Sequence, residues 1–144
     1  MIAVVDYDTG NLRSVDNAFR RIGVEAVFTD DHAVIRSADR VLLPGVGEAS
    51  SAMAKLRERG LDRLIPSLTQ PVLGICIGMQ LMCLTSEEGA AECMGIFDTD
   101  VVRFSADKSG GVKVPHMGWN TVSELSGPLF DGIAPETFFY FVHS

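Results

Sequence analysis

Residues 72–80 of this 144-residue chain read Val-Leu-Gly-Ile-Cys-Ile-Gly-Met-Gln. The apolar run at residues 72–75 is typical of a buried strand, and the segment from Gly78 onward is typical of a helix. Cys76 therefore stands between two glycines where a strand turns into a helix. Small neighbours let the backbone turn sharply and let a substrate approach, as a nucleophile elbow requires, here with sulfur in place of a hydroxyl. We predict that Cys76 is a nucleophile and that the N–H of Ile77 faces a developing oxyanion.

Short apolar runs rich in Val, Ile and Leu alternate with segments of helical period over the first three-quarters of the chain. This alternation is typical of a parallel sheet with helices on both faces. The predicted strands are residues 2–5, 25–28, 41–43 and 72–75, and the predicted helices are residues 12–22, 49–59 and 61–68. We therefore predict a three-layer α/β/α fold with a mostly parallel central sheet, of the flavodoxin-like class.

Beyond residue 85 the pattern changes to shorter runs typical of strands. These runs are residues 101–104, 119–122 and 138–142, separated by Gly and Pro, and they predict an antiparallel extension of the sheet. Residues 105–111 are typical of a mobile surface loop. The last predicted strand has no covering helix after it, so we expect residues 1–144 to form a single domain that is incomplete at its carboxyl end.

Composition and charge exclude several classes of function. Hydrophobic residues make up 47% and charged residues 22% of the chain, which is typical of a globular domain. The net charge of -7 repels phosphate backbones, so we expect no nucleic acid as a partner. No apolar run approaches the ~18–20 residues that span a bilayer, and no signal peptide is evident. We therefore expect no membrane partner and a cytoplasmic location.

The cysteines and histidines show no metal-ligand spacing. Without a C-x-x-C pair or a clustered histidine, we expect no disulfide framework, no metal and no cofactor. Cys83 and Cys93 lack glycine neighbours, so buried packing is the better interpretation of both. A catalytic Cys76 needs a base, and neither His116 nor His143 is followed by a nearby Asp or Glu. The residues alone leave the base open.

A second glycine-containing loop, Leu-Pro-Gly-Val-Gly at residues 43–47, leaves the end of the third predicted strand. Carboxyl ends of parallel strands are where open α/β sheets bind ligands. Gly45 and Gly47 free the backbone to turn an N–H toward the ligand, so we predict a second oxyanion donor here, opposite Ile77. Alone, such a string is more often a plain turn, and its pairing with the elbow makes the interpretation specific.

Two further segments carry candidate functional residues. Residues 114–120 read Val-Pro-His-Met-Gly-Trp-Asn. For His116 a hydrogen-bonded structural role is favoured over a catalytic one, and an exposed Trp119 would suit a partner surface. The loop at residues 6–11, Asp-Tyr-Asp-Thr-Gly-Asn, is not interpreted as a phosphate loop, because its carboxylates would repel phosphate.

The elbow at residues 74–80 and the loop at residues 44–47 resemble those of the class I (triad) glutamine amidotransferases. Residues 6–11, 115–120 and 140–144 extend the resemblance over the whole chain. The string Pro-His-Met-Gly-Trp-Asn is similar to that of the glutaminase subunits in the family that supply a cyclase in histidine biosynthesis.

The resemblance implies the fold of that family and a glutaminase in which Cys76 attacks the side-chain amide of glutamine, forms a glutamyl thioester and releases ammonia. It implies oxyanion donors at Val46, Gly47 and Ile77, and substrate-binding residues at Gly45, Gln80, His143 and Ser144. The implied partner is a (β/α)8-barrel cyclase subunit in a heterodimer, which uses the ammonia to make imidazole glycerol phosphate and an aminoimidazole carboxamide ribotide. The interface with this partner is expected at Asp8, Gly10, Asn11, His116, Trp119 and Asn120.

The chain departs from the family pattern at one point. In the family a histidine and a glutamate in a His-x-Glu string complete the triad, and residues 1–144 contain no such string. We therefore expect a fragment or a natural truncation that is inactive by itself for lack of this pair. Two alternatives stay open, a non-catalytic scaffold that binds the cyclase and an amidotransferase of another pathway.

Overall fold

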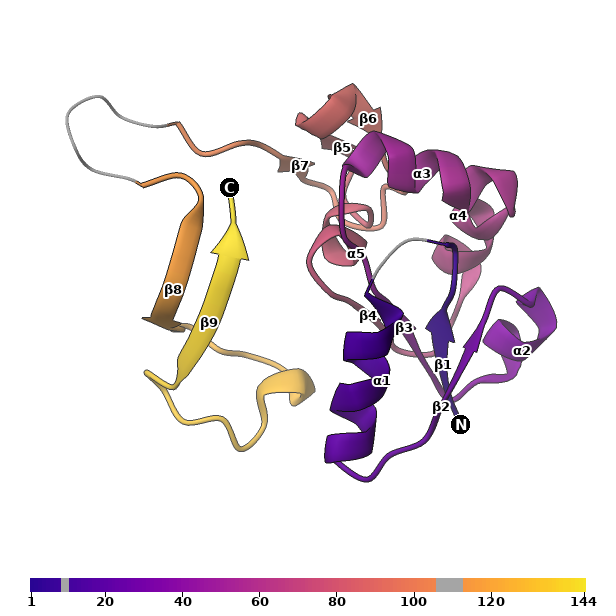
Figure 1. Ribbon diagram of the computed structural model, residues 1–144, viewed down its shortest axis with the longest axis horizontal. Helices are drawn as coiled ribbons and strands as arrows, with labels where there is room; N and C mark the ends of the chain where they lie inside the picture. The colour runs from indigo at the N-terminus through magenta and orange to yellow at the C-terminus, as the bar shows by residue number, and fades with distance from the viewer. Residues whose placement is uncertain (9–10, 106–112) are drawn as a thin grey trace. The chain divides into compact units, whose positions relative to one another are not determined.

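A computed structural model describes residues 1–8, 11–105 and 113–144 of the chain. The chain forms two compact units, Met1–Val102 and Arg103–Ser144, and each is described by itself. The first unit contains a four-stranded parallel sheet with the strand order β2-β1-β3-β4 (Figure 1). The order 2-1-3-4 of parallel strands confirms the predicted flavodoxin-like class.

The elements of the sheet region follow the predicted alternation. The strands are β1 (Ile2–Val5), β2 (Ala26–Thr29), β3 (Arg40–Leu43) and β4 (Val72–Gly74), and the helices are α1 (Leu12–Arg21), α2 (His32–Ser37), α3 (Ala49–Glu58), α4 (Leu61–Leu64) and α5 (Ile77–Gln80). The predicted helix at residues 61–68 is instead α4 followed by the 3-10 helix η1 (Ile65–Ser67). Pro66 lacks the N–H that an α-helix needs at that point, so the helix tightens there.

The main core lies between one face of the sheet and α3 and α4. Ala3, Val5 and Leu43 contribute from the strands, and Met53 and Leu56 contribute from α3, all at most 2% exposed. Alternate strand residues point to the opposite face of the sheet. On that face Val4 of β1 and Leu42 of β3 are buried as well, as expected for a parallel sheet that is covered on both faces.

A small sheet follows α5 in the first unit. It consists of β5 (Thr85–Ser86), β6 (Ala91–Glu92) and β7 (Asp100–Val101), in the order β6-β5-β7, with the 3-10 helix η2 (Glu88–Ala90) between β5 and β6. The predicted strand at residues 101–104 overlaps β7 only at Val101. Two-residue strands carry no periodicity that a sequence could show, so the prediction missed β5 and β6.

The second unit is built on an antiparallel pair of strands. The strands β8 (His116–Thr121) and β9 (Phe138–His143) lie side by side along their full length, and the 3-10 helix η3 (Pro128–Phe130) lies between them in sequence (Figure 1). The two strands are antiparallel, as predicted, but they form a separate two-stranded sheet, so the predicted extension of the four-stranded sheet is wrong for the described residues. Among these residues β8 pairs with β9 alone, and it begins three residues before the predicted start. The predicted loop at residues 105–111 lies, apart from Ser105, outside the described residues. Within the described ranges, no helix has the length and apolar character needed to cross a membrane.

Candidate active site

Cys76 stands in the turn between β4 and α5. β4 ends at Gly74 and α5 begins at Ile77, and Cys76 between them has φ 53° and ψ -121°. A backbone held in such a sparsely populated region costs a non-glycine residue about 1–3 kcal/mol. A strained turn of this kind is what exposes the nucleophile in an elbow, and the Cys76 side chain is exposed. The structure thus gives this thiol both the backbone and the access that a nucleophile needs.

The glycines beside Cys76 allow close contact between backbones. A Cβ added to Gly74 would stand 2.6 Å from the Met79 Cα, and one added to Gly78 would overlap the carbonyl oxygen of Leu43. Because carbon atoms do not approach so closely, neither position accepts a side chain without a shift of the main chain. The glycines therefore let the first turn of α5 pack directly on the ends of β3 and β4.

Among the described residues, backbone hydrogen bonds hold the elbow without using the N–H of Ile77. The N–H of Ile75 donates to Leu43 O at 3.0 Å, the N–H of Gly78 to Ile75 O at 3.0 Å, and the N–H of Gln80 to Cys76 O at 3.1 Å. Within residues 1–8, 11–105 and 113–144, no such bond is donated by the N–H of Ile77. An N–H at the start of a helix and next to the nucleophile can stabilise an oxyanion.

The loop at residues 44–47 contacts the elbow. Pro44 and Gly45 are buried, and a Cβ at Gly45 would stand 2.6 Å from the Gly78 nitrogen and 2.9 Å from the Ile77 Cβ. Gly47 has φ 93°, which favours glycine, and apart from its chain neighbours no atom of the described residues lies within 4 Å of where its Cβ would be. The loop is thus packed at its first half and open at its second, where Val46 is 49% exposed.

Sequence reasoning missed the contribution of Tyr7 to this loop. Tyr7 lies two residues beyond the end of β1, is fully buried, and donates its hydroxyl to Pro44 O at 2.8 Å. The signal that could have found it is an aromatic residue just beyond an apolar strand, at the same edge of the sheet as the oxyanion loop (residues 44–47).

The remaining predicted residues of the first unit lie at exposed or half-buried positions. Gln80, the last residue of α5, is half-buried one turn beyond Cys76. Asp8 has φ 60°, and its carbonyl oxygen accepts a hydrogen bond from Lys55 Nζ. Asn11 caps α1 by accepting from the Ser14 N–H at 3.2 Å. Gly10 lies outside the described residues.

In the second unit the structure brings together His143 and His116. These residues are directly opposite in the β8–β9 register, with His116 Nδ1 and His143 Nε2 3.1 Å apart, and His116 stacks on Phe141. The hydrogen bond agrees with the structural role favoured for His116. Ser144, which follows β9, is exposed. The pairing could not be seen in the sequence, because it depends on the register between two distant strands.

Trp119 and Asn120 point to opposite faces of the β8–β9 pair. Successive residues of a strand alternate between faces, so Trp119 shares a face with Tyr140, its cross-strand neighbour, and the two rings make an edge-to-face contact. Asn120 shares the other face with His116, and its side-chain oxygen accepts from the Thr121 N–H at 2.9 Å. Trp119 is 69% exposed, so the interface predicted here has a large apolar side chain available.

The other two thiols differ from Cys76 in their surroundings. Burial raises the pKa of the Cys83 thiol, and the charge of Asp100 raises it further. Burial also raises the pKa of the Cys93 thiol, against a smaller opposing effect of the Arg57 charge. A raised pKa lowers the fraction of reactive thiolate at neutral pH, so Cys83 and Cys93 are poor nucleophiles.

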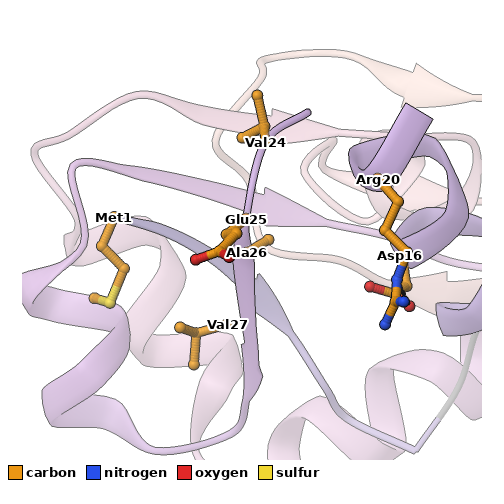
Figure 2. Close-up of a pocket in the computed structure, with 7 residues that line it drawn as sticks. All are labelled: Met1, Asp16, Arg20, Val24, Glu25, Ala26 and Val27. Atoms are coloured by element: carbon orange, nitrogen blue, oxygen red, sulfur yellow. Dashed lines mark hydrogen bonds and ion pairs between the residues drawn. The ribbon is translucent and has the colours of Figure 1, made fainter. Parts of the chain in front are cut away.

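A pocket elsewhere in the first unit holds none of the candidate residues. It has a volume of about 590 Å³ and lies beside β2 and α1 (Figure 2). Its lining is Met1, Asp16, Arg20, Val24, Glu25, Ala26 and Val27. Asp16 and Arg20 already form an ion pair at 2.8 Å. In the part of the chain that the structure describes, no three His, Cys, Asp or Glu residues gather as metal ligands would.

Comparison with known proteins identifies the family. Residues 3–144 match the sequence profile of the family described as glutamine amidotransferase class-I. The chain is 59% identical over 143 residues to the imidazole glycerol phosphate synthase subunit HisH of Bacteroides fragilis (strain YCH46), covering 99% of this chain and 72% of that relative. It is 47% identical over 149 residues to the subunit of the same name from Sulfurimonas denitrificans, covering 100% of this chain and 72% of the relative.

A solved structure has the same fold as this chain. A solved structure described as the crystal structure of glutamine amidotransferase superposes with a TM-score of 0.71 at 18% identity, over 99% of this chain and 70% of that one. At this identity the likeness shows the fold, and it agrees with the parallel sheet and elbow described above. The chain belongs to the class I glutamine amidotransferase family.

Proposed function

We propose that this chain is the glutaminase subunit of an imidazole glycerol phosphate synthase in histidine biosynthesis. The names of the relatives and their coverage of this chain support the subunit assignment. The single structural observation that carries the chemistry is the strained, exposed Cys76, held between Gly74 and Gly78 and against the loop at residues 44–47.

The first chemical step is attack by Cys76 on glutamine. The thiolate adds to the side-chain amide carbon, and the C=O pair of electrons moves onto oxygen to give a tetrahedral oxyanion. The N–H of Ile77 and the N–H groups of Val46 and Gly47 are the donors proposed for this oxyanion. Two observations support these donors. The N–H of Ile77 donates no backbone hydrogen bond within the described ranges, and Gly45, at the start of the loop, packs on the start of α5.

The second step releases ammonia. The tetrahedral species collapses, the C–N bond breaks with proton transfer to nitrogen, and a glutamyl thioester remains on Cys76. Water then adds to the thioester, the C–S bond breaks, and glutamate leaves with the thiol restored. Among the described residues, His116 and His143 pair with one another, with no carboxylate hydrogen-bonded to either ring. The resemblance assigns the base to a His-x-Glu string instead.

Four residues are proposed to bind the substrate. Gln80 is proposed to hold glutamine because it lies one turn along α5 from Cys76 and is half-buried. Gly45, beside the elbow, and the strand end at His143 and Ser144 are proposed to contact the backbone groups of glutamine.

The partner proposed for this subunit is a (β/α)8-barrel cyclase in a heterodimer. It uses the ammonia to form imidazole glycerol phosphate and an aminoimidazole carboxamide ribotide. One face of the β8–β9 pair supports a protein partner, since its large apolar side chains are each more than half exposed. They are Met117 (62%), Trp119 (69%), Phe138 (64%), Tyr140 (54%) and Val142 (55%).

Other contacts are proposed from the β1–α1 loop. Asp8, Gly10 and Asn11 are assigned to the interface, together with His116 and Asn120 on the other face of the β8–β9 pair. Because Trp119 combines an aromatic ring with the greatest exposure on its face, it is the best candidate for a binding hot spot.

The test is glutamine hydrolysis by the protein expressed from its complete reading frame, in complex with the cyclase and its nucleotide ligand. Ammonia and glutamate should form in equal amounts, and Cys76→Ser should abolish both. A quenched reaction should leave a glutamyl adduct on the peptide that contains Cys76. Glutamine hydrolysis that continues in Cys76→Ser would contradict the mechanism. Tight cyclase binding without any hydrolysis would favour the scaffold alternative.

A further inference from the structure

We propose that Tyr7 is a positioning residue of the oxyanion loop, with its hydroxyl fixing the orientation of the peptide that links Pro44 and Gly45. The inference rests on the proposed function, because it concerns the donors that stabilise the oxyanion on glutamine. It adds to that function a residue outside both glycine motifs.

The contact itself is direct and buried. The Tyr7 hydroxyl donates to Pro44 O at 2.8 Å, and Tyr7 is fully buried in the core cluster with Leu43 and Ile77. The hydroxyl oxygen also lies 3.0 Å from the position of a Cβ on Gly45. Tyr7 therefore contacts the oxyanion loop at the point where that loop contacts the elbow.

Planarity of the peptide bond turns this contact into a constraint on the loop. The carbonyl of one residue and the N–H of the next point to opposite sides of a single rigid plane. Holding the Pro44 carbonyl toward Tyr7 therefore fixes where the Gly45 N–H points. Without this bond, rotation at Gly45 and Gly47 would leave the loop free to turn its peptide groups, because neither residue has a side chain to restrict it.

Helix α3 and its C-cap residue, Arg59, anchor the chain on both sides of Tyr7. Lys55 Nζ donates to the carbonyl oxygen of Asp8, and Arg59 Nη1 donates to the carbonyl oxygen of Asp6 at 3.4 Å. The oxyanion loop leads directly into the same helix, which begins at Ala49. The segment around Tyr7 is thus held by α3, and α3 is the helix that follows the oxyanion loop. The Tyr7 hydroxyl links this segment back to the loop.

The peptide between Pro44 and Gly45, which Tyr7 holds, is followed by the N–H groups of Val46 and Gly47, the proposed oxyanion donors. Within residues 1–8, 11–105 and 113–144, no backbone hydrogen bond is donated by Val46 or Gly47. In the described part of the chain these N–H groups have no backbone acceptor, and the Pro44–Gly45 peptide before them is fixed. Such donors are preorganised for a negative charge that develops only during the reaction. The role of Tyr7 is therefore expected in kcat, with glutamine affinity little changed.

The experiment compares Tyr7→Phe with Ile35→Val in the complete protein bound to its cyclase. Tyr7→Phe removes one buried hydroxyl and keeps the ring. Ile35→Val removes one buried methylene elsewhere in the same core, at a residue that is also 0% exposed, and so controls for lost stability. For each complex, kcat and KM for glutamine, the melting temperature, and the rate of Cys76 alkylation by iodoacetamide are measured.

We expect Tyr7→Phe to lower kcat by about tenfold or more, because small misplacement of catalytic groups has effects of this size. KM should stay within twofold. Alkylation should keep its rate, because displacement of iodide develops no oxyanion. Ile35→Val should keep the kcat of the unaltered complex, even if its melting temperature falls as much as that of Tyr7→Phe.

Other outcomes separate the two hypotheses. Equal kcat for Tyr7→Phe and the unaltered complex would overturn the role of Tyr7 and leave the proposed function intact. A kcat lowered alike in Ile35→Val, or an alkylation rate lowered in step with kcat, would also overturn it, since either shows general disturbance of the fold or elbow. No hydrolysis by the unaltered complex would overturn the proposed function and this inference with it.

Discussion

Replacing Gly47 by alanine tests the backbone conformation of the oxyanion loop without adding a steric clash. Gly47 has φ 93°, and in the described part of the chain nothing beyond its two chain neighbours lies within 4 Å of the place where a Cβ would stand. The added methyl group therefore meets no atom, and the only cost is that of the backbone conformation. For an L-residue in a left-handed conformation this cost is roughly 1–2 kcal/mol.

The loop has two ways to respond to this strain. If it keeps its conformation, the free energy of unfolding falls by the strain energy and catalysis survives. If it relaxes to negative φ, stability recovers but the N–H of residue 47 turns away. We expect relaxation, because Val46 and Gly47 are exposed and little packing opposes it. Loss of one oxyanion donor lowers kcat by about 10²–10³-fold, or ~3–4 kcal/mol.

The assay is kcat at saturating glutamine in the cyclase complex, with urea unfolding of the same preparation. Gly23→Ala is the matched control, because Gly23 has φ 70°, nothing within 4 Å of its Cβ position, and a place just after α1. It should lose about 1 kcal/mol of stability and keep its kcat. If the Gly47→Ala complex is folded and turns over within twofold of the unaltered complex, residue 47 does not donate to the oxyanion.

Four other outcomes can be checked. A chloroketone analogue of glutamine should label Cys76 alone at neutral pH, because burial raises the pKa of the Cys83 and Cys93 thiols; peptide mass mapping that finds the label mainly on those two would contradict the assignment. With iodoacetamide, the same two thiols should react only at higher pH than an ordinary thiol, since a raised pKa delays formation of the thiolate as pH rises. Gly78→Ala should prevent folding, because its Cβ would overlap a carbonyl oxygen at the end of β3, and a cooperative thermal transition by circular dichroism would disprove this. Trp119→Ala should weaken cyclase binding by about 2 kcal/mol, or ~30-fold in Kd by calorimetry, and an unchanged Kd would place the interface elsewhere.

Much of the fold could be predicted because its signals are local. The apolar run of β1 gave that strand its observed bounds, Ile2–Val5, and the apolar spacing in α1 gave its start. Helix α2, His32–Ser37, was not predicted, because six residues with one buried side chain show no helical period. Its signal is the cap, since the Asp31 carboxylate accepts from the N–H groups of Ala33 and Val34.

In the candidate site, too, the sequence predicted the local features and missed the contacts between distant segments. The strained turn at Cys76 and the glycines around it are local features, so the sequence predicted the elbow. The hydrogen bond from Tyr7 to Pro44 joins two strand ends 37 residues apart, and the His116–His143 contact depends on strand register. Contacts of this kind follow from tertiary structure, and no spacing along the chain encodes them.

The apolar face of the β8–β9 pair has a consequence for how the protein is made. Met117, Trp119, Phe138, Tyr140 and Val142 present their side chains to solvent on one face of a two-stranded sheet. Such a surface attracts its own copies until a partner covers it. We therefore expect residues 1–144, expressed alone, to associate through this face. If the proposed cyclase is the partner that covers it, co-expression of the two proteins should raise the soluble yield.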